Sequence, residues 1–385
     1  MLTYYSRYSF ENRYFRYRYS TTMRTKPANY NSHIMTQKVR KGEELPEVAL
    51  KAFLRQHQLI TNQQSPWEVS QYSTGFSNLT YLIKIEGKEL VLRRPPRGAI
   101  KRGHDMGREY KVLTGLNKEF DKAPQAYIYT ENVDILGAPF YLMEKVEGII
   151  LTNQFVKQRG VSAEEFRMIF ECWLDTFVEL HAIDYEAIGL GDLGRPAGYV
   201  ARQVRNWGKQ YLAASTEEIP EAKQLMTWLT EHQPTEYDHC LIHNDYKYDN
   251  VVFADDSWQS IRAILDWEMC TLGDPLMDLG AAVAYWITDD DDPLIRMIFP
   301  YPTALPGNPT RSEVVQRYSM KSGRQINDLI FYYSFGLFKN AVIVQQIYYR
   351  YQKGLTSNEK FAKLNKVTKL FCQMAWKAVQ NNRIE

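Results

Sequence analysis

A short polar stretch between two apolar runs constrains this sequence more than any other feature. Residues 241–253 read LIHNDYKYDNVVF, and residues 264–275 read ILDWEMCTLGDP. Polar groups enclosed by buried strands cost free energy unless they are paired or take part in chemistry. Asp245, Asn250 and Asp266 are therefore the first candidates for a functional site.

The spacing of these three side chains suits a metal-dependent reaction. Asp245 and Asn250 lie five residues apart, and Asp266 begins the turn after the next predicted strand. We expect this spacing to gather two carboxylates and an amide at the mouth of a hairpin. Such oxygen ligands suit Mg²⁺, which takes few protein ligands together with phosphate oxygens and water. The remaining carboxylate can orient a hydroxyl nucleophile, although the same residue types also occur simply as turn caps.

The composition is typical of a globular chain in a reducing compartment. The 385 residues suffice for two lobes, and 44% of them are hydrophobic. No apolar run reaches the roughly 18 residues that would suggest a membrane span. Four scattered cysteines favour a cytoplasmic location over a disulfide framework, and His239, Cys240 and His243 match no common zinc finger. The net charge of +2 is uninformative, and we expect neither a nucleic-acid partner nor a membrane.

A β-rich first part and a helical second part predict an α+β fold. Alternating apolar residues and turns predict strands within residues 67–92, 126–130 and 140–144, and helices over 46–59 and 104–116. Beyond Gly148, Ser162 and Glu165 form a capping box before a long apolar stripe. We expect a front lobe with a five-stranded sheet at residues 45–145, and a helical lobe with one hairpin at residues 146–385.

The first residues stand apart in composition. Residues 1–34 are rich in Tyr, Arg and Ser and contain one acidic residue, Glu11. We predict a disordered leader over residues 1–44, or an extension upstream of Met35. An organelle transit peptide is the alternative, but the scarcity of Leu and Ala argues against an amphipathic targeting helix. The mixture of Arg and Tyr also leaves salt-sensitive nucleic-acid binding as an alternative for this segment.

The two polar stretches resemble the signature of a kinase family. The spacing H-x-D-x-x-x-x-N, followed by a turn that begins with Asp, is similar to the protein-kinase motifs. The sequence is closer to the aminoglycoside-phosphotransferase-like kinases, and within them to the kinase-like domain of certain acyl-CoA dehydrogenase fusion proteins. The narrower resemblance rests on sequence segments spread over roughly residues 45–375, namely GFSNLTYLI, LVLRRPP, REYKVLTGL, PFYLMEKVEG, RPAGYVARQVRNW, DWEMCTLGDPLMDLG and QQIYYRYQKGLTS. It implies a two-lobed protein-kinase-like fold with ATP between the lobes.

The resemblance also implies a role for each candidate residue. Asp245 would be the catalytic residue that orients the acceptor hydroxyl, and Asn250 and Asp266 would hold Mg²⁺ against the phosphates of ATP. The remaining ATP-binding residues would be Gly75, Ser77 and Asn78 over the phosphates, Arg93 paired with Glu109 at the phosphates, and Met143, Glu144, Lys145 and Val146 beside adenine. His243, Asp274 and Asp278 are expected to brace the loop or cap turns.

Two departures from the family pattern fall within the loop. Asn244 stands where the family usually has Gly, and Lys247 stands where Arg is common. Asn tolerates left-handed backbone angles better than most residues, so the first change is compatible with the same loop. The acidic and amide groups are intact, which favours an active enzyme over an inactive scaffold.

The sequence says less about the molecule that accepts the phosphate than about the nucleotide that donates it. Between Asp266 and Asp274 there is no room for a long activation segment, which favours a small molecule over a protein substrate. Four acids at 289–292 suit a polycationic aminoglycoside, or are simply a solvated loop. Arginines at 195, 202 and 205 suit an anionic ligand such as the phosphates of a CoA ester.

These observations predict an ATP- and Mg²⁺-dependent phosphotransferase. It would move the γ-phosphate to a hydroxyl of a small molecule, with a hydroxyacyl-CoA-type metabolite as one acceptor class and an aminoglycoside or other amino alcohol as the alternative. A nucleotide-binding pseudokinase or regulatory scaffold is the competing class, in which Asp245→Asn would change nothing measurable.

Overall fold

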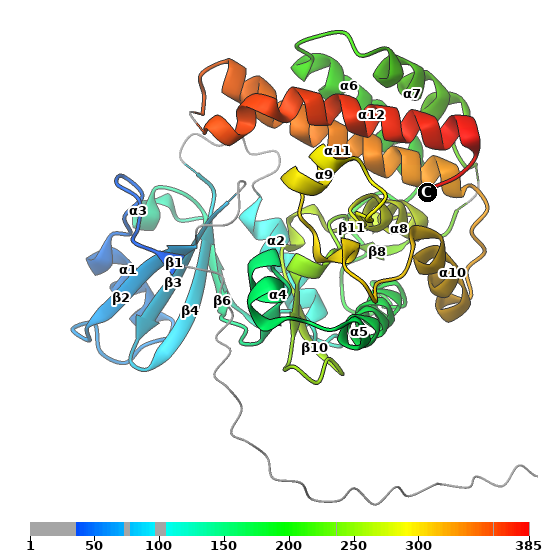
Figure 1. Cartoon of the computed structure of the whole chain (residues 1–385). Helices are drawn as coiled ribbons and strands as arrows, with labels where there is room; N and C mark the ends of the chain where they lie inside the picture. Colours follow the sequence, from blue (N-terminus) through cyan, green and yellow to red (C-terminus); the bar gives the residue numbers. More distant parts are fainter. Residues whose placement is uncertain (1–35, 73–77, 97–104, 236, 357, 385) are drawn as a thin grey trace, which may run out of the picture. The chain divides into compact units, whose positions relative to one another are not determined.

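The computed structural model describes residues 36–72, 78–96, 105–235, 237–356 and 358–384. These residues belong to one compact unit, in which a β-rich front lobe precedes a helical lobe (Figure 1). The α+β class and the order of the two lobes are as predicted. Strand β6 ends at Glu144 and β7 begins at Ile149, so the predicted lobe boundary at 145/146 falls in this connection and stays a prediction.

The front lobe is built on an antiparallel sheet. Among the described residues its strand order is β1-β2-β3-β4-β6-β5. The strands are β1 Thr36–Gln37, β2 Trp67–Tyr72, β3 Leu79–Ile85, β4 Lys88–Arg94, β5 Ala126–Thr130 and β6 Phe140–Glu144. The helices are α1 Glu47–Gln56, α2 Met106–Leu116 and α3 Val133–Leu136. The two strands expected at 126–130 and 140–144 are therefore confirmed.

The two faces of the sheet meet different helices. Leu92 of β4 belongs to a core that the sheet shares with α1, whereas Val91 packs on the side of α2 and the helical lobe. Successive side chains of a strand point to opposite faces. Arg93 therefore shares the face of Val91, toward the helical lobe, and Arg94 shares the face of Leu92.

The sheet has one strand more than the sequence predicted. Strand β1 pairs with the edge strand β2, and Tyr81 donates a hydrogen bond to the carbonyl of Glu43 at 2.8 Å. Residues 36–44, which the prediction assigned to the disordered leader, are thus tied to the sheet. A two-residue strand is too short to produce a hydrophobic period, which explains the error. The rest of the predicted leader, residues 1–35, lies outside the described residues.

In its described residues, the helical lobe carries two small sheets rather than one hairpin. Strand order is β10-β9-β7 in one sheet and β11-β8 in the other. The strands are β7 Ile149–Ile150, β8 Cys240–Ile242, β9 Val251–Phe253, β10 Ile261–Ile264 and β11 Thr271–Gly273. The α-helices are α4 Asn153–Arg159, α5 Ala163–His181, α6 Tyr199–Ala214, α7 Pro220–Glu231, α8 Pro275–Ala284, α9 Pro293–Ile298, α10 Arg311–Ser322, α11 Leu329–Gln352 and α12 Leu364–Asn381. Short 3₁₀ turns are η1 Tyr248–Asn250, η2 Trp267–Met269, η3 Pro302–Ala304 and η4 Glu359–Lys363.

Helices α8 and α11 pack closely against each other and support the polar loop at residues 243–250. A Cβ on Gly280 would lie 2.3 Å from the Tyr332 carbonyl oxygen, and one on Gly336 would lie 2.4 Å from the Gly280 carbonyl oxygen. Both positions therefore require glycine, because any side chain would push the helices apart. The two helices run below α12, which lies beside α11 (Figure 1). Most of α11 is buried, and this helix places Lys339 where its Nζ donates to the Asn244 carbonyl.

None of the helices in the described parts of the chain has both the length and the apolar character of a membrane span.

Candidate active site

The polar loop between β8 and β9 is braced from within by His243. This side chain is fully buried, and its Nδ1 accepts a hydrogen bond from the Asp245 backbone N–H at 3.2 Å. Nε2 must then carry the proton that is donated to the Leu265 carbonyl at 2.9 Å. Burial lowers the pKa of His243, which keeps the ring neutral. His243 thus links the loop to the turn that carries Asp266.

A second brace comes from Asp278 on α8. Its carboxylate accepts the backbone N–H groups of His243 at 2.6 Å and Asn244 at 2.7 Å, and lies 3.2 Å from His181 Nε2. Burial opposes ionisation of this carboxyl, but its hydrogen bonds outweigh burial and hold its pKa below the usual value. The expected bracing role of Asp278 agrees with this geometry. Asp274 caps α8 by accepting from the Leu276 N–H at 2.8 Å.

Asn244 adopts the conformation that makes glycine common at this position. Its φ is +66°, in the left-handed region, which costs free energy for a residue with a Cβ. The side chain offsets part of that free-energy cost, because it donates to the Met269 carbonyl at 3.1 Å and accepts from Tyr199 at 3.3 Å. Asn244 therefore keeps the loop in the shape that the resemblance implies.

Asp245 is held ionised in a partly buried position. Asn250 donates from Nδ2 to the Asp245 Oδ2 at 2.7 Å, and Lys247 Nζ lies 3.1 Å from the same oxygen. Burial opposes the charge, but Lys247 and then Lys339 outweigh it and lower the pKa of Asp245. Asp245 is thus a carboxylate at neutral pH, and its orientation is fixed by Asn250.

Asn250 and Asp266 meet across the hairpin of β9 and β10. Val251 pairs with Ile264, and the Leu265 N–H donates to the Asn250 carbonyl at 2.8 Å. Asp266 has a φ of +65° and a side chain that is 38% exposed, compared with 14% for Asp245. Asp266 is therefore the more accessible of the two carboxylates, and the backbone bond of Leu265 brings its turn beside Asn250.

Arg93 connects the front sheet to this turn. Its Nη1 lies 2.7 Å from Glu109 Oε1 on α2, and its Nη2 lies 3.2 Å from Asp266 Oδ1 and 3.5 Å from Glu268 Oε2. Burial disfavours the charge of the guanidinium, but the three carboxylates raise the pKa of Arg93 well above its usual value. The predicted pair of Arg93 and Glu109 is thus present, and it forms part of a larger acidic cluster.

The charge balance of this cluster suits a divalent cation. One guanidinium faces three carboxylates, and the buried Arg93 Nε has no hydrogen-bond partner among the described residues. In the same residues, three or more His, Cys, Asp or Glu side chains nowhere gather closely enough to hold a metal by themselves. Asn250 and Asp266 fit Mg²⁺, because this ion binds through one or two protein oxygens together with phosphate and water.

The predicted nucleotide contacts in the front lobe are only partly described. Gly75 and Ser77 lie outside the described residues, whereas Asn78 donates to Glu268 Oε2 at 2.9 Å. Met143 is buried at the end of β6, and Glu144 accepts from the Gln125 N–H at 2.9 Å.

The connection after β6 is tied on both sides. Lys145 forms an ion pair with Glu89, and Val146 packs beside Val252 and Ile150 in a small apolar cluster. These side chains are thus engaged with the protein.

Three residues of the site had no role in the sequence prediction. Glu268 joins the Arg93 cluster, and Lys339 donates to the Asn244 carbonyl at 2.5 Å. Tyr285 lies near Asp245, and burial together with the charge of that carboxylate raises the pKa of Tyr285. A lysine inside the apolar run of α11 was the visible signal for Lys339. Nothing in the local sequence marks Tyr285, because only the packing of α8 brings it to the loop.

Comparison with known proteins gives consistent matches along the chain. The profile of the family described as the phosphotransferase enzyme family matches residues 68–307, more than half of the chain. Acyl-CoA dehydrogenase family member 10 of Mus musculus is 32% identical over 343 residues, covering 89% of this chain and 32% of the relative. Acyl-CoA dehydrogenase family member 11 of Rattus norvegicus is 33% identical over 317 residues, covering 81% and 40%. The chain spans about a third to two-fifths of the length of these relatives.

Solved structures confirm the predicted two-lobed, kinase-like fold. A structure from Ralstonia eutropha, named as a candidate aminoglycoside phosphotransferase, is 31% identical with a TM-score of 0.74 and covers 88% of this chain and 99% of its own. An aminoglycoside phosphotransferase in ternary complex with AMP-PNP and hygromycin B is 14% identical with a TM-score of 0.54, covering 86% and 99%. At that identity the second likeness concerns the fold alone.

Proposed function

The chain belongs to the phosphotransferase enzyme family and is by class a small-molecule phosphotransferase, and we propose that it transfers the γ-phosphate of ATP to an alcohol with the help of Mg²⁺. One observation carries this proposal. The ionised Asp245 is tied to Asn250, and Asn250 adjoins the exposed carboxylate of Asp266. A group that can orient a nucleophile thus lies beside two residues that could hold a metal, the arrangement on which phosphoryl transfer depends.

The donor side of the reaction is assigned to the cluster around Arg93. Asn250 and Asp266 would hold Mg²⁺, which neutralises negative charge on the phosphate oxygens when bound. Arg93, kept in place by Glu109, would face a phosphate with its guanidinium group. The use of ATP is supported by the fold relative that binds AMP-PNP.

The remaining nucleotide contacts are proposed from the resemblance. Gly75, Ser77 and Asn78 would cover the phosphates, and the backbone of Met143, Glu144, Lys145 and Val146 would contact adenine. The assignment of adenine to this connection agrees with its engaged side chains.

On the acceptor side, Asp245 is proposed to accept a hydrogen bond from the substrate hydroxyl. The new bond joins the acceptor oxygen to the γ-phosphorus as the bond from the γ-phosphorus to the bridging oxygen breaks. ADP leaves with that electron pair, and the hydroxyl proton passes to the Asp245 carboxylate and then to solvent. Lys247 and Lys339 keep Asp245 ionised before the reaction.

A hydroxyacyl-CoA-type metabolite is the proposed acceptor class. Two relatives are acyl-CoA dehydrogenase family members, although the chain matches less than half of their length. Arg195, Arg202 and Arg205 lie on or before α6, the helix whose Tyr199 contacts the loop residue Asn244. Arg202 donates to the carbonyls of Ala197 and Arg195, whereas Arg195 and Arg205 are exposed. Arg195 and Arg205 are therefore the two side chains offered to an anionic acceptor.

An aminoglycoside is the less favoured acceptor, because the acidic run expected to attract it is engaged in folding. Asp289 pairs with Arg296, Asp291 pairs with the buried Arg311, and Asp292 caps α9 by accepting from the Leu294 N–H. Only the remaining acid of the run is left for a ligand. These contacts support a role of the acidic run in the folded loop rather than in binding a polycation.

The proposal is tested by Mg²⁺-dependent release of ADP from ATP across a panel of hydroxylated metabolites. The panel holds 3- and 4-hydroxyacyl-CoAs, aminoglycosides, choline and homoserine, with Asp245→Asn and Asp266→Ala as controls. We expect turnover with one acceptor class that both substitutions abolish. A pseudokinase would instead show no turnover with any acceptor and no rise in melting temperature with Mg·ATP.

A further inference from the structure

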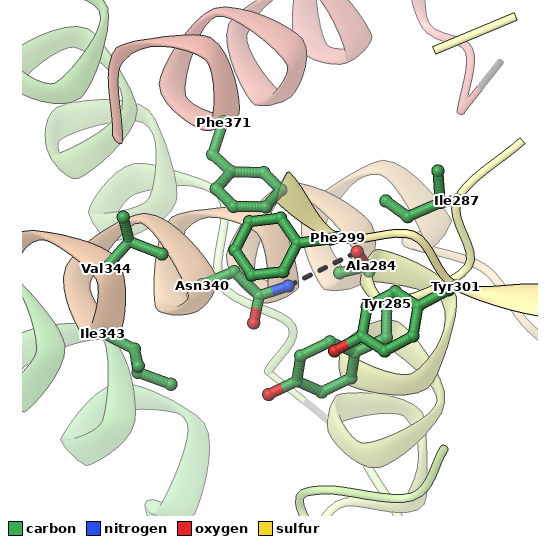
Figure 2. Close-up of a pocket in the computed structure, with 9 residues that line it drawn as sticks. All are labelled: Ala284, Tyr285, Ile287, Phe299, Tyr301, Asn340, Ile343, Val344 and Phe371. Atoms are coloured by element: carbon green, nitrogen blue, oxygen red, sulfur yellow. Dashed lines mark hydrogen bonds between the residues drawn. The ribbon is translucent and has the colours of Figure 1, made fainter. Parts of the chain in front are cut away.

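A small apolar pocket opens next to the proposed catalytic residue. It has a volume of about 60 Å³, several times the roughly 10–15 Å³ that one water needs, and its exposed surface is almost entirely carbon. Helix α8 and the segment after it contribute Tyr285, Phe299 and Tyr301, while α11 and α12 contribute Val344 and Phe371 (Figure 2). A pocket of this size and surface suits an apolar group of a few carbons.

Aromatic packing keeps this pocket open rather than collapsed. Phe299 lies between Phe371, at a centroid distance of 5.6 Å, and Tyr301, on which it stacks at 6.3 Å (Figure 2). Tyr301 meets Tyr285 edge to face at 6.4 Å. Rigid rings supported on both sides form a fixed wall, and such preformed apolar sites bind ligands without a large ordering cost.

The pocket is connected to the reaction site through Tyr285. Tyr285 lines the pocket, and its side chain also lies near the Asp245 carboxylate. Lys247, which pairs with Asp245, lies 4.9 Å from the centre of the Tyr285 ring. A molecule that places a hydroxyl at Asp245 therefore has the pocket within reach of its next few atoms.

We propose that this pocket binds the apolar substituent of the phosphate acceptor, so that the preferred acceptor is an alcohol with a short alkyl group close to the reacting hydroxyl. This inference rests on the proposed function, because it takes Asp245 as the residue that faces the hydroxyl. The pocket requires the acceptor to carry an apolar group. Phosphoryl transfer at Asp245 requires only a hydroxyl, so the pocket adds a second condition on the acceptor.

The lining carries no charge that would favour a polycation. Its one amide among the described residues, Asn340, donates to the Ala284 carbonyl at 3.3 Å and is thereby occupied by the protein (Figure 2). Charged amino groups would lose their hydration in this pocket without a partner, which is costly. The pocket thus selects for alcohols with an apolar side and against aminoglycosides.

The test measures binding of straight-chain primary alcohols, from ethanol to octanol, by saturation-transfer NMR on the full chain. Burying one methylene is worth about 0.8 kcal/mol, so we expect affinity to rise about four-fold per carbon until the pocket is full. In Val344→Phe, which fills the pocket, this rise should stop at a shorter chain. In Ile343→Ala, which widens it, the rise should continue further. Val48→Phe makes the same change at an exposed site and should match the parent protein.

Parallel measurements separate this inference from the proposed function. The rise in melting temperature with Mg·ATP should be equal in all variants, and ADP release with hydroxylated acceptors should follow the same chain-length order. Affinity that is independent of chain length, or equal in Val344→Phe and Val48→Phe, would overturn the pocket assignment even if ADP release with polar acceptors persisted. Chain-length-dependent binding without phosphoryl transfer to any hydroxyl would overturn the acceptor role and the proposed function together.

Discussion

The Nη2 atom of Arg93, on the front sheet, lies 3.2 Å from the carboxylate of Asp266 in the helical lobe. These residues are separated by 173 positions in the chain. A single ion pair thus fixes the distance between a proposed phosphate contact and a proposed metal ligand. Because Glu109 holds the other side of the guanidinium, the contact depends on the position of α2 as well.

Arg93→Lys should impair nucleotide use although it preserves the charge. An ammonium cannot reproduce the fork that reaches Glu109 and Asp266 at once. Losing one charge-assisted hydrogen bond of about 1.5–3 kcal/mol predicts a fall of roughly 10- to 100-fold in kcat/KM for ATP. Steady-state kinetics with varied ATP measures this fall.

Arg94→Lys is the matched control for this change. Arg94 is the adjacent residue, equally buried, but it faces the other side of the sheet and donates to the Leu136 carbonyl at 3.1 Å. We expect this variant to lose stability while its KM for ATP stays close to the parent value. Equal losses of kcat/KM in both variants would show that Arg93 acts through the sheet and not at the nucleotide.

The left-handed conformation of Asn244 predicts an unusual order of stabilities. Asn244→Gly and Asn244→Ala both lose the side-chain bonds to Met269 and Tyr199. Only Ala also carries a Cβ at φ +66°, which costs about 1–2 kcal/mol. Denaturant unfolding should therefore find Asn244→Gly more stable than Asn244→Ala by that amount. Equal stability would mean that the loop relaxes to a right-handed conformation.

Asp278→Asn should loosen the polar loop. The carboxylate accepts the N–H groups of both His243 and Asn244, and an amide can accept only one of them. A buried N–H left without an acceptor costs about 1–3 kcal/mol, and a fall of this size in the free energy of unfolding is expected. Asp121→Asn, at a side chain that is 90% exposed, should leave stability unchanged. A stable Asp278→Asn variant with full activity would contradict the bracing role.

The buried Asp274 is expected to make the free energy of unfolding depend on pH with a sign opposite to that of most acidic residues. Burial raises its pKa from the ordinary 3.8 to about 6, so the folded protein binds this proton more tightly than the unfolded chain. The contribution of Asp274 to stability is thus greatest below about pH 4 and is lost as the pH rises through about 6. Two pKa units correspond to roughly 3 kcal/mol.

Comparison with Asp274→Asn isolates this effect, because the other titrating groups are the same in both proteins. The asparagine can still cap α8 at Leu276 and meet Tyr332. The stability of the parent relative to the variant should fall by roughly 3 kcal/mol between pH 4 and 7, as measured by urea unfolding. A difference that is independent of pH would show that Asp274 titrates normally.

The parts of the fold predicted from sequence are those with a long local signal. The strands at 126–130 and 140–144 alternate clearly, and the capping box of Ser162 and Glu165 opens α5 as expected. Strands β1, β7, β8 and β11 have two or three residues each, too few for any period. Their pairing is decided by tertiary contacts, so the sixth strand of the front sheet and the second small sheet of the helical lobe were not foreseen.

The same distinction applies to the candidate site. Short polar segments between apolar runs contain Asp245, Asn250 and Asp266. The family resemblance gave these residues roles, and those roles are still proposals. Tyr285 and Lys339 reach the loop only because α8 and α11 pack closely through Gly280 and Gly336. Contacts of this kind depend on helix packing and leave no trace in local sequence spacing.

The most direct test compares Asp245→Asn with Asp266→Asn in Mg·ATP binding and in phosphoryl transfer. Asp245 is assigned to the acceptor hydroxyl and Asp266 to the metal. We therefore expect Asp245→Asn to keep the Mg·ATP-induced rise in melting temperature and to lose transfer by about 10²–10³-fold. Asp266→Asn should lose both. Transfer at the parent rate in Asp245→Asn, in the presence of an accepted alcohol, would contradict the account.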